Sequence, residues 1–372
     1  MNGSVNRAEY EKVQISPWQL FALLMITRLV PVVIGFPLAS VTTQEQDLWI
    51  SVLLSIPISL AYSLLVVRLC EAFPGKSLIG ILLHLLGPVL GRFAGLLLLN
   101  SWILILAAML RAVAEVNVAA VTPETPVVVF LALLAAAAVY AARKGLEPIA
   151  RGSEIVLIIL SGFFLFLLVL PLNLAEPSNL LPLLEHGWET VILGTLNTVS
   201  FYTEFAIAGM LLPHLRHRKG GRKPVIGAVF ASSALLLVFI VVLIMVFGSL
   251  LSSIAFPAFS LARVVSVGEF IERTESLGMV AWVLTHSLKC SLFTWACAVG
   301  LAEVFGIPDA KPLMAPLGFL SVALALTFFR DGFELYRFFQ VRTGGALNLG
   351  LHLVLAFAVL GGLAWKKLTT GK

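Results

Sequence analysis

The chain contains 372 residues, of which 59% are hydrophobic and only 12% are charged. A soluble globular domain carries about 25% charged residues, so the composition excludes an ordinary soluble protein. The net charge of +5 indicates no nucleic-acid partner, because the basic residues are distributed by the sides of a membrane and do not gather in one patch.

Ten apolar runs are long enough to cross a bilayer, which requires about 20 residues per helix. Because each run is continuous and does not alternate, a transmembrane β-barrel is excluded. We therefore expect an all-α integral membrane protein with one membrane domain over 1–372, in which 1–14 and 366–372 are short tails. The predicted transmembrane helices are 15–41, 49–70, 93–118, 126–142, 150–172, 190–212, 224–248, 277–303, 312–329 and 346–365.

The 25 Lys and Arg residues divide unequally between the two sides of this topology. Seventeen lie on the side of the termini, five on the opposite side and three within predicted helices. Basic loops are retained in the cytoplasm, so we predict a multi-pass membrane protein with both termini cytoplasmic. The loop before the seventh helix contains Arg216, Arg218, Lys219, Arg222 and Lys223.

The first and sixth predicted helices each contain an interruption. In the first, Pro31 lacks a backbone donor, and Gly35-Phe36-Pro37 follows shortly after. In the sixth, the polar run 195–204 can satisfy backbone groups that an unwound segment would free. Two interrupted helices five spans apart are typical of an inverted five-plus-five transporter fold, although a proline also kinks helices for structural reasons alone.

Three ionisable side chains, Arg28, Glu204 and Lys289, lie near the middle of predicted helices. A charge exposed to lipid there costs from a few to roughly ten kcal/mol or more, so all three should face the bundle interior. One interpretation is that Glu204 merely neutralises Arg28 or Lys289 and joins helices. The other is that these groups bind or gate a zwitterionic solute or carry a proton. The predicted solute site consists of Arg28, Pro31, Gly35, Ser200, Thr203, Glu204 and Thr285, with Lys289 beside it as an ion surrogate or proton carrier.

Arg111 and Glu115 lie near the outer end of the third predicted helix. Their spacing of four places them on one helix face, which predicts an ion pair that is either structural or part of an outer gate. Gly91 and Gly95 indicate close helix packing. His286 is interpreted as a hydrogen-bonded core residue.

Two predicted external connections, 173–189 and 249–276, are longer than the others. Within the second, the apolar residues between Phe259 and Ile271 suggest either a short helix on the outer surface or a plain loop. We favour the helix.

No enzyme motif stands out in the chain. The six histidines form no H-E-x-x-H, and Gly75-Lys76-Ser77 lacks the first glycine of a phosphate loop, since position 70 is Cys70. The other two cysteines, Cys290 and Cys297, also lack metal-ligand spacing. We expect a protein that is not an enzyme and uses no cofactor or metal.

Several segments, in order, resemble the B-subunit permease family of endospore germinant receptors, within the amino acid/polyamine/organocation superfamily. The segments are Arg111-Ala112-Val113-Ala114-Glu115, Thr122-Pro123-Glu124-Thr125-Pro126, 141–151, Phe73-Pro74-Gly75-Lys76-Ser77-Leu78, and 263–273 with Glu275, Trp282 and Lys289. The similarity covers nearly the whole chain.

The resemblance implies ten helices in a five-plus-five fold and a role in sensing small-molecule germinants, typically amino acids, at the spore inner membrane. It also implies assembly with a larger membrane-anchored A subunit and a lipoprotein C subunit. Related sodium-coupled transporters hold a cation between the first and eighth helices, where Lys289 would take its place. Two other hypotheses remain open: a stand-alone proton-coupled amino-acid transporter, and a membrane scaffold with a vestigial pocket.

Overall fold

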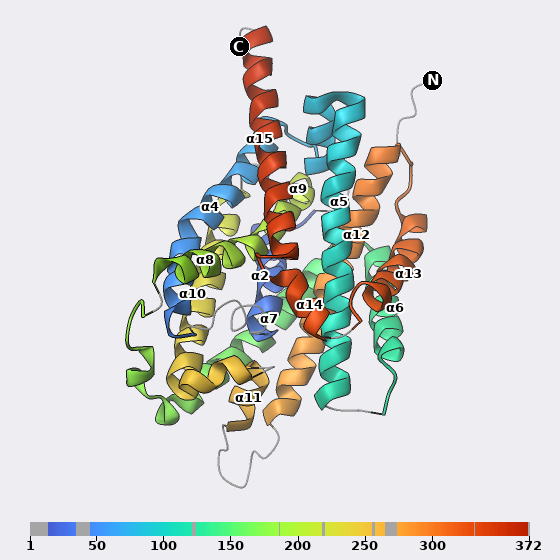
Figure 1. The fold of residues 1–372 in the computed structure, drawn as a ribbon. Coiled ribbons are helices and arrows are strands. Elements are labelled where there is room, and N and C mark those ends of the chain that lie inside the picture. Colours follow the sequence, from blue (N-terminus) through green and yellow to red (C-terminus); the bar gives the residue numbers. More distant parts are fainter. Residues whose placement is uncertain are drawn as a thin grey trace.

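The computed structural model describes residues 14–34, 45–120, 124–185, 187–217, 220–254, 257–264, 274–330 and 332–370. In these ranges the chain is a bundle of helices without a named β-strand, which confirms the all-α prediction (Figure 1). Eight helical segments are long and apolar enough to cross a membrane, judged by length and composition. They match the second to eighth and the tenth predicted spans. The first and ninth coincide with α2 (Pro17–Ile34) and the shorter α13 (Lys311–Thr327).

The other long helices follow the predicted order. They are α4 (Leu48–Ala72), α5 (Leu78–Ala120), α6 (Val127–Lys144), α7 (Leu146–Val169), α10 (Arg222–Phe247), α12 (Thr274–Phe305) and α15 (Gly344–Thr370). Short helices join them: η1 (Glu45–Asp47), η2 (Leu170–Leu174), η3 (Pro177–Leu180), η6 (Gly248–Ser253), α11 (Pro257–Val264) and α14 (Gly332–Phe339).

The sixth span is interrupted, as the sequence predicts. α8 (Trp188–Tyr202) gives way to the tighter helix η4 (Thr203–Ile207), one turn of α9 (Ala208–Leu211) and then η5 (Leu212–His214). The change in winding begins at the end of the polar run, where the Thr203 hydroxyl donates to the Ser200 carbonyl over 2.6 Å. A side chain thus takes part in backbone pairing where the regular ladder stops.

The first span differs from its prediction. α2 continues through Pro31 to Ile34, so Pro31 does not interrupt the described helix. The predicted break at Gly35-Phe36-Pro37 lies outside the described residues.

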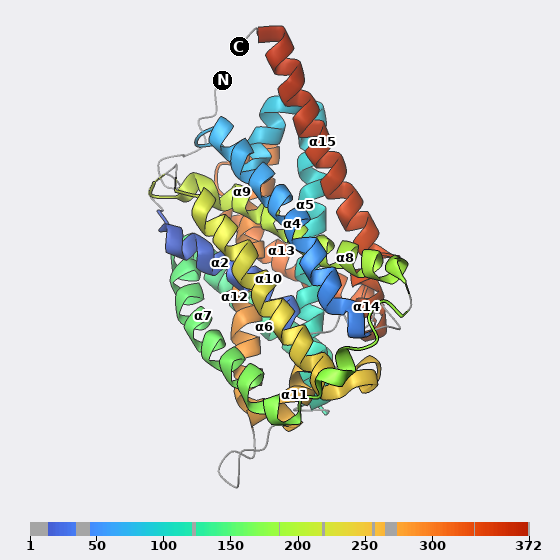
Figure 2. The same cartoon turned by 90° about the vertical axis from the view of Figure 1, so that its left-hand side faces the viewer.

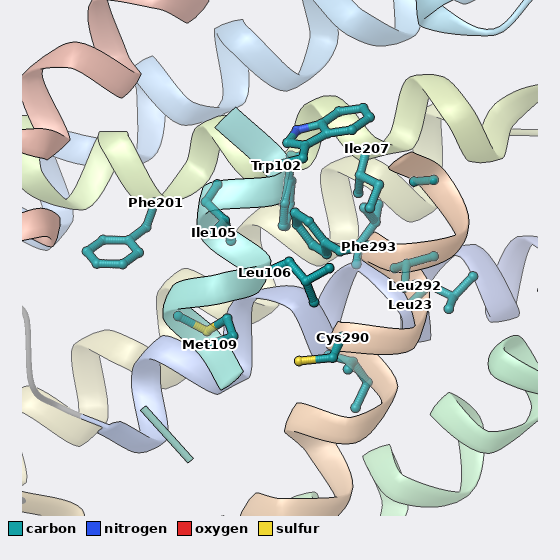
Figure 3. Packing of buried hydrophobic residues seen from close by; sticks show 14 of the residues in the cluster. Leu23, Trp102, Ile105, Leu106, Met109, Phe201, Ile207, Cys290, Leu292 and Phe293 are labelled. Atoms are coloured by element: carbon teal, nitrogen blue, oxygen red, sulfur yellow. The ribbon is translucent and has the colours of Figure 1, made fainter. Parts of the chain in front are cut away.

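The long helices pack in two groups. In the first group, α4 contacts α8 and α10, and α10 also contacts α2. In the second, α12 contacts α5 and α6, and α13 contacts the same two helices. Figure 2 shows α4 and α10 on the face opposite to α5 and α12. The groups meet where α2 and η4 lie beside α5 and α12, and buried residues such as Leu23, Leu106, Ile207 and Phe293 fill this junction (Figure 3).

The two long connections are more structured than loops. α11 confirms the predicted short helix, but it packs into the bundle, because Phe259 and Leu261 are buried and Phe259 lies 5.0 Å from the Trp282 ring. Val265, Phe270 and Ile271 lie outside the described residues. In the other connection, Asp47 accepts hydrogen bonds of 3.0 and 3.1 Å from the Leu184 amide.

The helix of the third span, α5, begins at Leu78 and not at residue 93 as predicted. It contains a sharp bend at Gly87, which we call the elbow. Gly87 has φ 78° and ψ −178°, which separates a short first segment from the long helix (Figure 1). The long segment folds back so closely that a Cβ on Gly91 would lie 2.6 Å from the Leu83 Cα atom. A Cβ on Gly95 would lie 3.2 Å from Val304 of α12. The G-x-x-x-G spacing therefore serves close packing, as predicted.

Replacing Gly91 by Ala should destabilise the protein, since the methyl group collides with backbone that cannot rotate away. The expected loss is about 1–3 kcal/mol, typical of overpacking. Thermal unfolding of the purified protein in detergent measures it. The matched control is Gly162→Ala in α7, where no atom lies within 4 Å of the new Cβ; unchanged or higher stability is expected there. An equal response of both variants would contradict the elbow as the cause.

Candidate functional site

The structure joins Glu204 and Lys289 in a buried ion pair. The Lys289 ammonium donates to Glu204 Oε2 over 2.8 Å, and both side chains are almost fully excluded from the surface. Lys289 comes from the middle of α12 and Glu204 from η4. The prediction that Glu204 lies inside the bundle at the break of the sixth helix is confirmed. Of the two pairings left open for Glu204, the one with Lys289 forms.

The ammonium also reaches the first helix. Lys289 Nζ donates to the Thr27 carbonyl over 3.0 Å. In an α-helix this carbonyl would accept from the amide four residues later, but that residue is Pro31, which has no N–H. The proline thus leaves a carbonyl free inside the membrane domain, and the lysine satisfies it. The Lys289 ammonium therefore lies against the backbone of the first predicted helix.

Arg28 is buried beside the pair but bonds differently. Its guanidinium carbon lies 4.4 Å from the centre of the Tyr202 ring and 5.5 Å from that of Phe201. Its Nε and Nη2 atoms are buried and have no hydrogen-bond partner among the described residues. Among the described residues Arg28 forms no ion pair with Glu204, and its charge acts on Glu204 and Lys289 electrostatically. The described centre therefore contains two cations and one anion.

Tyr202 holds Arg28 in place and is itself fixed. The ring is fully buried at the end of α8, and its hydroxyl bonds to Ser232 and Ser233 of α10. A buried tyrosine ring with an anchored hydroxyl is a rigid surface for a cation.

Ser200 and Thr203 face α15, a contact that the sequence analysis missed. The Ser200 hydroxyl donates to the Gly345 carbonyl over 3.2 Å, and the Asn348 amide donates to Thr203 Oγ1 over 2.9 Å. One turn further along α15, His352 is buried and bonds the Tyr62 hydroxyl of α4 over 2.6 Å. In the sequence, Asn348 and His352 stand out only as polar residues in an apolar helix. This position does not identify their partners.

Tyr62 and His352 also line a small cavity of about 40 Å³ between α4, α5, η4 and α15. The remaining lining is apolar, with Leu82, Ala206 and Leu355 among its members. His352 Nε2 is buried and has no partner among the described residues.

Thr285 and His286 have hydrogen-bond partners on their own helix, α12. Thr285 is one turn before Lys289 and donates to the Ala281 carbonyl of its own helix over 2.6 Å. His286 is a hydrogen-bonded core residue, as expected, since it accepts from the Trp282 indole over 2.7 Å. Gly35 lies outside the described residues.

Arg111 and Glu115 form the predicted ion pair. Both Nε and Nη2 of Arg111 donate to Glu115 Oε1, and the Nε distance is 2.7 Å. Nη2 also donates to the Arg330 carbonyl over 2.6 Å, which ties α5 to the chain after α13. This second bond supports the structural interpretation of the pair.

The sequence matches a known family of proteins over most of its length. The model of the family described as spore germination protein, the spore permeases, matches residues 14–331. The chain therefore belongs to the spore germination permease family. In Bacillus subtilis (strain 168), spore germination protein KB is 27% identical over 327 residues, which cover 86% of this chain and 87% of that protein. Spore germination protein YndE of the same strain is 26% identical over 290 residues, 77% and 78% of the two chains.

Two solved transporters share the fold. A Na⁺-coupled sialic acid symporter in a substrate-bound outward-open state aligns with a TM-score of 0.67 at 12% identity, over 95% of this chain and 82% of the symporter. MhsT in complex with L-phenylalanine aligns with a TM-score of 0.59 at 14% identity, over 95% and 99%. At these identities the likeness extends to the fold alone.

Because Lys289 and Glu204 form an ion pair, the effects of replacing each of them on the stability of the protein should not be additive. Lys289→Met leaves a buried carboxylate and Glu204→Gln leaves a buried ammonium, and breaking a buried pair from one side costs about 3–5 kcal/mol. The double variant Lys289→Met/Glu204→Gln leaves neither charge and should regain most of the loss. Thermal unfolding of the four proteins in detergent gives the coupling. Additive losses would contradict the pairing.

Proposed function

We propose that this chain is the membrane subunit of a nutrient germinant receptor that binds a small solute, an amino acid, to trigger spore germination. The observation that carries the proposal is the buried Lys289–Glu204 pair, which joins α2 to the break of the sixth span. Family membership supplies the role in germination, and the transporter fold supplies the type of site. The solute would lie beside Arg28 and η4, between the first and sixth spans.

The packing of the helices supports an inverted five-plus-five repeat. If the ten predicted spans are numbered in order, three pairs of helix contacts are related by a shift of five spans. α2 packs on α10 and α4 on α8; α5 packs on α13 and α6 on α12; α2 packs on α7 and α8 on α15. These pairs correspond to spans 1–7 and 6–2, 3–9 and 8–4, and 1–5 and 6–10. Two equivalent halves would produce this pattern.

Signalling requires that the solute prefers one conformation of the receptor. The break of the sixth span is suited to this role, because it bonds to α12 through Glu204 and to α15 through Thr203. A change at η4 would reach the rest of the bundle, and from there the A and C subunits with which we propose the chain assembles.

The second candidate function is a stand-alone proton-coupled amino-acid transporter. It is favoured by the same pair, because a buried lysine and glutamate in contact can exchange a proton. Uptake of amino acids into proteoliposomes that contain this chain alone would support the transporter. Binding without uptake supports the receptor.

The double variant Lys289→Met/Glu204→Gln separates a functional pair from a structural one. If the pair takes part in sensing or coupling, the double variant should reach normal membrane levels and still fail to germinate spores or bind solute. Germination rate and protein level are measured in the same spores. Normal germination would mean that the pair only joins helices. Arg151→Gln, which breaks the exposed pair with Glu147, is the matched control and should be silent.

We further propose that both termini and the loop around Arg216 are cytoplasmic, in the spore inner membrane or the cell membrane. The three native cysteines are buried, so an added cysteine can be labelled selectively. Arg216→Cys should resist an impermeant thiol reagent in intact cells and react after permeabilisation. Leu183→Cys, exposed in the outer connection, should react in intact cells. The reverse pattern would overturn the topology.

A further inference from the structure

Arg28 presents an unused hydrogen-bonding edge inside the protein. Its two unpartnered atoms, Nε and Nη2, lie on the same side of the guanidinium and donate in parallel. Arg111 uses this edge elsewhere in the chain, because the same two atoms both donate to one carboxylate oxygen of Glu115. The edge of Arg28 is therefore a carboxylate-binding geometry without a carboxylate among the described residues.

The charge balance of the centre requires an anion there. Lys289 and Glu204 compensate each other over 2.8 Å, which leaves the guanidinium of Arg28 as the unbalanced charge. None of the ion pairs that the structure describes includes Arg28, and residues 29–44 contain no charged side chain. A buried cation without a counter-ion destabilises the protein by several kcal/mol. An anion that binds beside Arg28 would remove this penalty, and the free energy recovered would favour its binding.

The geometry also orients the edge. Stacking of the Arg28 guanidinium on Tyr202, at 4.4 Å, covers one face of the cation. The bonds of the Tyr202 hydroxyl to α10 prevent the ring from moving aside. A guanidinium fixed by its face loses little entropy when a planar carboxylate docks on its edge.

We propose that the Nε–Nη2 edge of Arg28 is a carboxylate subsite and that the solute of this chain carries a net charge of about −1. Such a solute is an acidic amino acid or a simple small carboxylate, because a neutral zwitterion would leave the extra positive charge in place and bring an ammonium toward Lys289. The inference rests on the proposed solute site.

Binding to the purified full chain tests the charge of the solute directly. The probes are L-aspartate and L-asparagine, which are nearly identical in shape and differ by one negative charge, and propionate and L-alanine as a second pair. Measurements use isothermal calorimetry in detergent, in a buffer without carboxylates. The wild-type chain should bind aspartate at least tenfold more tightly than asparagine.

Variants assign the preference to Arg28. Arg28→Met should abolish the difference between aspartate and asparagine, and Arg28→Lys should retain a reduced difference, since an ammonium keeps the charge without the fork. Arg151→Met, which changes the same net charge at an exposed position, should leave the preference intact. If Arg28→Met does not fold, the comparison of aspartate with asparagine on the wild-type chain still tests whether the solute carries a negative charge.

Each outcome has a separate meaning. Equal or tighter binding of asparagine and alanine by the wild-type chain would overturn the carboxylate subsite and leave the proposed amino-acid site standing. Chloride alone competing with aspartate at equal concentration would replace the subsite by an unspecific anion site. Binding of none of the four probes would count against both the subsite and the proposed function.

Discussion

A missing amide at position 31 organises the centre of this protein. Since proline cannot donate, the Thr27 carbonyl is left without its helical partner, and the Lys289 ammonium takes that place. The same ammonium bonds to Glu204 where the sixth span changes its winding. One buried cation therefore connects α2, α12 and η4, and the geometry of the three elements depends on it. An uncharged side chain at position 289 would leave both a carbonyl and a carboxylate unsatisfied in an apolar interior.

The two cations of the centre, Lys289 and Arg28, make different contacts, which follow from the shapes of their charged groups. An ammonium is compact and has three rotatable donors, which suits the two acceptors that Lys289 meets in different directions. A guanidinium is planar and binds aromatic rings by its face, which suits Arg28 beside the Tyr202 and Phe201 rings. If the two residues were exchanged, the lysine would lose the stacking surface, and the arginine fork would not fit one carbonyl and one carboxylate on separate helices.

Much of this arrangement could be predicted from the sequence, because a membrane interior restricts polar residues strongly. Charges in the middle of apolar runs must face the bundle, and this placed Arg28, Glu204 and Lys289 inside before any contact was known. The polar run 195–204 located the break of the sixth span. In contrast, periodicity does not tell which cation meets Glu204, since Arg28 and Lys289 lie at similar depths. The α5 elbow was also missed, because the predicted span begins only at residue 93. Gly87-Pro88 is a dipeptide typical of turns, and Gly87 adopts φ 78° there.

The contacts of α15 were hidden for a related reason. Asn348 and His352 are isolated polar residues in an apolar helix, and their partners Thr203 and Tyr62 are far away in sequence. The Asn348 bond attaches η4 to α15 while Lys289 attaches it to α12, so the break is attached to two helices by hydrogen bonds of different kinds. The bond to α12 is an ion pair, which a charged ligand at Arg28 can strengthen or weaken. The bonds to α15 are between neutral groups, which such a ligand affects little. At the proposed carboxylate subsite, a solute charge near Arg28 would act unequally on the two attachments. Binding would move η4 to the extent that the solute prefers a conformation in which the ion pair is altered.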